Sequence, residues 1–203
     1  MKPILQSWSY GVLLLAAFAL SGCATLSVTP LQDIPATATK QPASIGIQVT
    51  GERLLEALND PAESAATAAS GKLFNKVTVL PPDAQGKTPA ELLSRYGVDY
   101  VMTTTLNDVN IHGDLNPIWF ISIPLVFFKP LAPIVTFESV VTLDSTVQDT
   151  HSGAVILKRQ VSAVTTDHFS PINPQAKVRK LAARAINNAF VDLLTETKLK
   201  VAK

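Results

Sequence analysis

The pattern of apolar and polar positions predicts five strands. Short β-rich runs predict strands at 44–50, 76–82 and 98–111. Apolar and polar side chains alternate from 135 to 149, and a similar run follows at 154–167 after the turn THSG. The segment 135–167 is therefore predicted to form an antiparallel hairpin.

Leucine spacing and helix-end residues predict the helices. Leu54, Leu55 and Leu58 are spaced as in a helix, and Pro61 either breaks this stretch or begins a second helix. Thr88 is a suitable N-cap for a helix that Gly97 ends. A long last helix starts at Pro174. Its apolar stripe consists of Val178, Leu181, Ala182, Ala185, Ile186, Ala189 and Leu193.

The order of these elements is β-α-β-α-β-β-β-α. It predicts an α+β fold at 44–198, with a mixed, mainly antiparallel sheet and helices packed on it. The segment 112–134 interrupts this order as an apolar, proline-rich insert.

The insert is strongly apolar, yet it does not resemble a spanning helix. The nine Ile, Leu, Val and Phe residues between Ile118 and Leu131 favour the membrane by roughly 4 kcal/mol in total. Lys129 opposes insertion by up to about 3 kcal/mol, and Pro124 and Pro130 cost up to about 3 kcal/mol each in an isolated helix. A spanning helix is therefore not expected here.

Three interpretations of the insert remain open. It can fold over the core of its own domain, dip shallowly into a membrane, or contact a partner or a second copy. The residues expected to make a membrane or partner contact are Trp119, Phe120, Phe127 and Phe128.

The amino terminus has the pattern of a secretory signal. Lys2 supplies a positive charge, and residues 11–20 form an apolar stretch of secretory length. The rival interpretation is an uncleaved anchor helix followed by a stray thiol. Residues 24–43, rich in Pro, Thr and Ala, lack a periodic pattern and are predicted to form a flexible tether.

The sequence Leu20-Ser21-Gly22-Cys23 resembles the bacterial lipobox. The resemblance implies a signal peptide at 1–22, cleavage after Gly22, and acylation of Cys23 by diacylglycerol and a fatty acid such as palmitate. The tether would then be 23–43. Ala24 rather than Asp follows the cysteine, which by the same analogy implies the periplasmic face of the outer membrane.

Charge and cysteine content exclude some partners. Lys2 is the only charged residue in 1–22, so 16 basic and 16 acidic side chains remain after cleavage. A nearly neutral chain is not expected to bind nucleic acid when its basic run KVRK at 177–180 is short and is interpreted as a solvated helix face. Cys23 is the only cysteine, so an internal disulfide is excluded.

Candidate catalytic residues are sparse. His112, His151 and His168 are far apart in the sequence and lack metal-ligand spacing, so neither a metal nor a cofactor is expected. The tetrapeptide DHFS at 167–170 holds the residue types of a hydrolase triad, but no G-x-S-x-G elbow accompanies it. The sequence therefore does not predict an enzyme.

Several local patterns resemble a module of envelope lipoproteins. They are LFNKVTVLPP, then ELLSRYGVDYVMTTTL, then paired strands around DTHSGAVIL, then a long closing helix. They resemble the curli-secretion lipoprotein, the TolB amino-terminal domain and the lipoprotein activators of penicillin-binding proteins, over roughly residues 44–198. These patterns are fold-driven, and no binding residue transfers with them.

The expected function is that of a non-catalytic outer-membrane lipoprotein. It would serve a secretion, export or cell-wall machine through contacts with an envelope protein or with copies of itself. One alternative is a periplasmic carrier of lipid or another apolar ligand. Another, with less in its favour, is an envelope hydrolase.

Overall fold

The computed structural model describes residues 31–36, 38–51, 58–115, 135–169 and 174–202. Within these ranges the chain confirms the predicted α+β class and the predicted order of strands and helices. The elements are β1 (Gln41–Gly51), α2 (Asn59–Leu73), β2 (Phe74–Val79), the 3-10 turn η2 (Pro82–Ala84), α3 (Pro89–Tyr96), β3 (Tyr100–Leu115), β4 (Val135–Asp149), β5 (Val155–Phe169) and α5 (Pro174–Val201).

The strands form one mixed sheet in the order β2-β1-β3-β4-β5. β1 pairs in parallel with β2 and with β3, while β3, β4 and β5 are antiparallel neighbours. The parallel pair β1–β2 is connected through α2, because parallel strands need a crossover rather than a tight turn.

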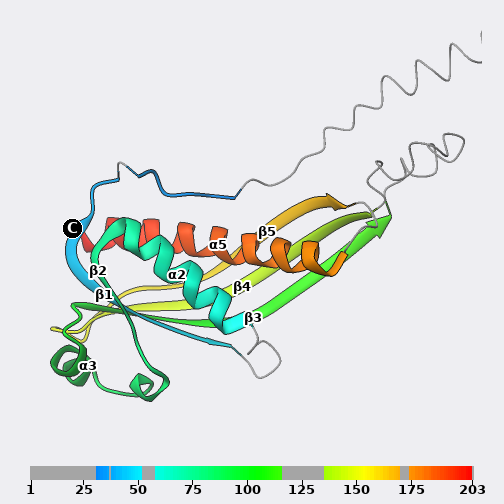
Figure 1. The fold of residues 1–203 in the computed structure, drawn as a ribbon. Coiled ribbons are helices and arrows are strands. Elements are labelled where there is room, and N and C mark those ends of the chain that lie inside the picture. Colours follow the sequence, from blue (N-terminus) through cyan, green and yellow to red (C-terminus); the bar gives the residue numbers. More distant parts are fainter. Residues whose placement is uncertain (1–30, 37, 52–57, 116–134, 170–173, 203) are drawn as a thin grey trace, which may run out of the picture.

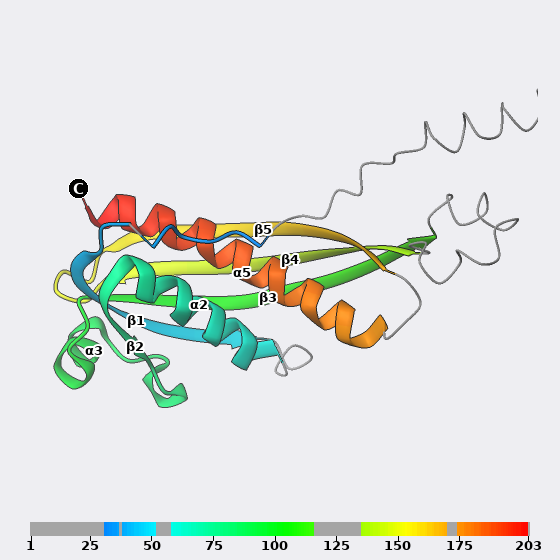
Figure 2. The ribbon, with the colours of Figure 1, turned by 45° about the horizontal axis from the view of Figure 1, so that its top comes forward.

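α2 and α5 run side by side along one face of the sheet (Figures 1 and 2). Their alanines allow close approach to the strands, and Phe74 and Phe190 fill the space between the layers with no exposed surface. Pro61 lies in the first turn of α2, where its missing N–H would have no helical partner. Pro61 therefore belongs to the start of α2, while Leu54 and Leu55 lie outside the described residues.

α3 covers the opposite face of the sheet at one end only. It begins at a capping box between Thr88 and Glu91 and ends at Gly97, whose φ of 61° suits glycine, as the sequence predicted. The side chains packed beneath α3 and η2 form a second, smaller core of Leu80, Ala84, Leu92, Val98 and Val101.

Part of the segment predicted as a tether packs on the helix layer. The backbone N–H of Gln32 donates to Asn188 Oδ1 (2.8 Å), and Asn187 Nδ2 donates to the Gln32 carbonyl (2.9 Å). Ile34 is 5% exposed, and Asp33 forms an ion pair with Lys72 of α2. In both views this segment runs beside α5 (Figures 1 and 2). Residues 32–34 thus contact the helix layer through an apolar side chain, hydrogen bonds and an ion pair.

None of the helices in the described ranges is both long enough and apolar enough to cross a membrane.

Candidate functional site

The site residues expected from the sequence lie outside the residues that the structure describes. They are Gly22, Cys23, Trp119, Phe120, Phe127 and Phe128. Their roles stay predictions, and the sites considered below are made of described residues.

The structure does show where the insert leaves and rejoins the fold. The last pair between β1 and β3 is Gly51 with Leu106, whereas β3 and β4 stay paired as far as Leu115 with Val135. At about 3.3 Å per residue, β3 continues roughly 30 Å beyond β1. The chain between 115 and 135 therefore starts and ends at the tip of the sheet, at the end away from α3 (Figure 1).

The sheet face opposite α2 and α5 is polar over β3, β4 and β5; it is called the polar face below. Residues paired across strands share a face, so the registers place Thr103 with Thr146 and Lys158, and His112 with Glu138 and Thr166. A bulge at Asn107 shifts the alternation of β3 by one residue, so that Asp108 pairs with Thr142 on the polar face. The side-chain amide of Asn107 donates to Asp144.

The polar face is acidic. Lys158 is the only lysine or arginine that β3, β4 and β5 place on it, whereas it carries the four exposed carboxylates of Asp108, Asp114, Glu138 and Asp144. A hollow of about 410 Å³ near Lys158 is less acidic than the rest of the face, because its lining includes Asp144, Lys158 and Arg159. The face can therefore attract a basic partner and repel an anionic one.

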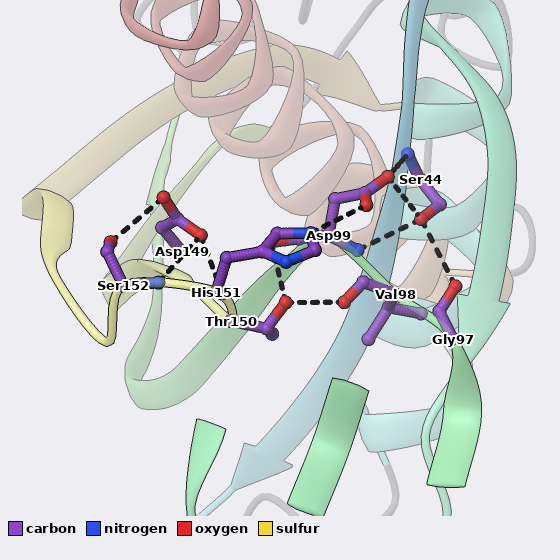
Figure 3. A network of polar contacts seen from close by, with 8 residues as sticks. All are labelled: Ser44, Gly97, Val98, Asp99, Asp149, Thr150, His151 and Ser152. Carbon is purple, nitrogen blue, oxygen red and sulfur yellow. Dashed lines mark hydrogen bonds and ion pairs between the residues drawn. The ribbon is translucent and has the colours of Figure 1, made fainter. Parts of the chain in front are cut away.

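A polar network closes the end of the sheet near α3; it consists of Ser44, Asp99, Asp149, Thr150, His151 and Ser152 and is called the sheet-end network. Figure 3 shows Asp99 between Ser44 of β1 and His151 of the β4–β5 turn. Asp99 Oδ2 accepts from the Ser44 backbone N–H and from Ser44 Oγ, both at 2.7 Å. Asp99 Oδ1 lies 3.1 Å from His151 Nε2.

The turn between β4 and β5 is held by its own side chains and by β3. Asp149 Oδ1 accepts from the His151 backbone N–H at 2.8 Å, and Asp149 Oδ2 accepts from Ser152 Oγ at 2.9 Å. Thr150 Oγ1 donates to the Val98 carbonyl at 2.6 Å, and the Thr150 backbone N–H donates to the Asp99 carbonyl. The turn is thereby fixed against the start of β3.

Hydrogen bonds lower the pKa of two carboxyls in this network. The backbone N–H of Ser44, followed by the Ser44 hydroxyl, lowers the pKa of Asp99 below its usual value. The backbone N–H of His151 and then the Ser152 hydroxyl lower the pKa of Asp149. Both carboxylates therefore stay ionised at neutral pH, which is the state that accepts these hydrogen bonds.

The arrangement of Ser44, Asp99 and His151 differs from a nucleophilic triad. In a triad the histidine lies between the serine and the carboxylate, so that it can take the serine proton. Here the carboxylate is in the middle, and the Ser44 hydroxyl donates to it. The geometry suits a structural fastening of three chain segments.

The histidines are separated in the structure as well. His151 belongs to the sheet-end network, while His112 and His168 lie on the polar face near the tip, where His168 Nδ1 contacts Thr136 Oγ1 at 2.9 Å. Within the described ranges, no group of three or more His, Cys, Asp or Glu side chains is placed to hold a metal ion.

The sheet-end network was missed by the sequence analysis, although its two halves were noticed. YGVDYV supplies Asp99, and DTHSG supplies Asp149 through Ser152. Both patterns were interpreted as fold-driven, and their contact depends on the register of β3 against β4, where Tyr100 pairs with Asp149. The only available signal was a polar cluster directly flanking two apolar strands.

No protein-family model matches this chain. No curated protein matches it either.

Solved structures do share the fold. The protein XCC0632 of Xanthomonas campestris, from the DUF330 family, matches with a TM-score of 0.50 at 10% identity, over 87% of this chain and 94% of that one. At this identity the likeness shows the fold alone.

Weaker matches include a lipoprotein and a dodecamer. Lipoprotein GNA1162 of Neisseria meningitidis has a TM-score of 0.38 at 14% identity, over 72% of this chain and 97% of that one. The PelC dodecamer of Paraburkholderia phytofirmans has a TM-score of 0.42 at 16% identity, over 79% of this chain and 91% of that one. Bacterial lipoproteins are thus among the structures that this chain is similar to.

Proposed function

We propose that this protein is a non-catalytic lipoprotein of the outer membrane that serves an envelope assembly through protein contacts. Cys23 anchors it by acyl chains, and the aromatic residues of the insert make the contact. Multiple acyl chains anchor stably, because each buried CH2 contributes about 0.8 kcal/mol.

The position of the insert carries this proposal. Its two ends lie at the tip of the sheet, roughly 30 Å beyond the last residue of β1. They are therefore distant from the core between β1, β2 and α2. A contiguous apolar segment carried at the end of a long projection is suited to reach another molecule.

Cross-linking in intact cells tests the contact. The native chain is compared with a Phe120→Ser, Phe127→Ser double variant, and cross-linked partners are recovered through a tag on the protein. The proposal predicts that the main adducts of the native chain are lost in the variant. Adducts of unchanged identity and yield would contradict it.

Two controls separate contact from folding. Val164→Ser removes an exposed apolar side chain from the polar face, where Val164 is 50% exposed, and should leave the adducts unchanged. Trp119 is the only tryptophan after removal of residues 1–22, so its emission reports on the insert. A buried spectrum in dilute, lipid-free monomer, together with unfolding of the double variant, would mean that the insert is core.

A second candidate function, a carrier of an apolar ligand, is favoured by one observation. Between α2 and α5 lies a hollow of about 390 Å³, lined by Leu58, Pro61, Ala183 and Ile186, with Arg179 beside them. This size and lining suit part of an acyl chain with an anionic head. A carrier predicts that fatty acid raises the melting temperature of the native chain more than that of Ala183→Trp.

A further inference from the structure

The charged side chains in the first half of α5 are all basic. Residues 174–191 contain no acidic residue and four basic ones, Lys177, Arg179, Lys180 and Arg184. Arg179 and Lys180 are exposed, and Arg184 pairs with Asp167 of β5 at 3.2 Å. The spacing of 177, 180 and 184 places three of them on one side of the helix.

Helix stability does not account for this set. The first turn of α5 has no acidic side chain, and Arg179, Lys180 and Arg184 lie beyond that turn, where the helix dipole has little effect. Lys198 and Lys200 at the other end of α5 follow the favourable pattern. Arg184 is explained by its ion pair with Asp167, so the exposed Arg179 and Lys180 are the cations whose position needs another reason.

The amino-terminal segment reaches the same side of α5. Asn187, which donates to the Gln32 carbonyl, follows Arg184 by three residues and Lys180 by seven, so all three share one side of the helix. At 1.5 Å per residue, Lys180 and Asn187 are about 10 Å apart along the axis. The described residues thus begin at Leu31, one residue before this contact with α5.

The remaining link to the anchor is short. From Cys23 to Leu31 it spans roughly eight residues, which reach about 26 Å when fully extended. An acylated Cys23 therefore holds this side of α5 close to the bilayer. The acidic polar face lies on the other side of the sheet.

We propose that the basic side of the first half of α5 binds anionic phospholipid headgroups, so that the helix layer faces the membrane and the polar face of the sheet faces away from it. This orientation rests on the proposed anchor at Cys23. The tether, the cations of α5 and the carboxylates of the sheet all favour it, because an anionic surface attracts the first face and repels the second.

Headgroup quenching tests the orientation. The acylated chain is placed in vesicles of phosphatidylethanolamine with phosphatidylglycerol, and a fluorophore is attached through Ala183→Cys on α5 or Ser162→Cys on the polar face. Both positions are exposed, and acylation would consume the only native thiol. A nitroxide on the lipid headgroup should quench the label at 183 much more strongly than the label at 162.

Charge variants identify the cause of the quenching. Arg179→Gln with Lys180→Gln should reduce the quenching at 183, because each cation near an anionic surface contributes about a fivefold increase in binding. The matched control, Lys198→Gln with Lys200→Gln, removes two cations from the other end of α5 and should not. In vesicles of phosphatidylcholine alone, the label at 183 should show the same reduced quenching as in the first variant.

Different outcomes would contradict the anchor and the orientation. A chain that fails to float with vesicles refutes the anchor, and the orientation with it. A floating chain with equal quenching at 162 and 183, or with quenching indifferent to Arg179 and Lys180, refutes the orientation alone. Cross-links between 183 of one copy and 162 of another, in place of quenching, would show that α5 binds the acidic face of a second copy instead.

Discussion

At the scale of single residues, Asp99 joins three segments of the chain. Its side chain accepts from Ser44 of β1 and contacts His151 of the β4–β5 turn, and its carbonyl accepts from Thr150. Ser44 is 7% exposed, so water cannot readily replace the carboxylate as its partner. One carboxylate thereby aligns the parallel and antiparallel parts of the sheet.

Replacing this carboxylate should lower the free energy of unfolding. Asp99→Ala leaves the Ser44 N–H without its acceptor and the Ser44 hydroxyl with only the Gly97 carbonyl at 3.3 Å, at a cost of about 1–2 kcal/mol after allowance for partial exposure. Urea denaturation followed by circular dichroism measures it. Asp114→Ala, an exposed carboxylate of β3, should change the value by less than about 0.5 kcal/mol. Equal losses in the two variants would contradict the fastening role.

The same residue contributes to acid sensitivity. The pKa of Asp99 is lowered in the folded chain, so the unfolded chain binds the proton more tightly. Its stabilisation is complete above its unfolded-state pKa, near 3.8, and is lost as the pH falls through the lower folded-state value. Asp99→Asn should therefore flatten the dependence of unfolding free energy on pH below about pH 5. Part of this pH dependence should remain in the variant, because the pKa of Asp149 is also lowered. An unchanged slope would contradict this.

At the scale of elements, residues 31–36 pack on the helix layer; this segment is called the strap. Ile34 is buried among core residues. Gln32 donates to Asn188 and accepts from Asn187, and these hydrogen bonds hold the segment beside α5. The strap determines on which side of the domain the chain leads toward Cys23.

Weakening the strap should expose it to protease. Ile34→Ala removes the main apolar contact of the segment, so cleavage by trypsin after the exposed Lys40 should accelerate while the melting temperature of the rest changes little. Mass spectrometry of timed digests measures it. Leu31→Ala, at a side chain that is 57% exposed, is the control. Equal cleavage rates in the native chain and in Ile34→Ala would contradict the strap.

Local signals were predictable from the sequence, and long-range pairings were not. Thr88 and Gly97 bound α3 as expected, and alternation located β4 and β5, because caps and side-chain period depend on neighbouring residues. The placement of β1 between β2 and β3, and the contact of Asp99 with His151, depend on register between distant segments. Ile34 was missed because one apolar residue among prolines and threonines has no period.

At the scale of the whole molecule, the two sides of the sheet differ in the charges they carry, and the proposed anchor at Cys23 would attach on the helix side. The helix layer carries the strap and the basic half of α5, and the sheet carries exposed carboxylates on its other side. The insert would extend from the tip, between these faces. An anchored chain of this design would present the same surface to its partner each time, because its tether is too short for free tumbling.

Mass spectrometry of the chain extracted from the cell envelope tests the central claim most directly. The account predicts a polypeptide that begins at Cys23 and carries a diacylglycerol thioether together with an amide-linked fatty acid. A chain that still begins at Met1, or one with a free thiol at Cys23, would contradict the account.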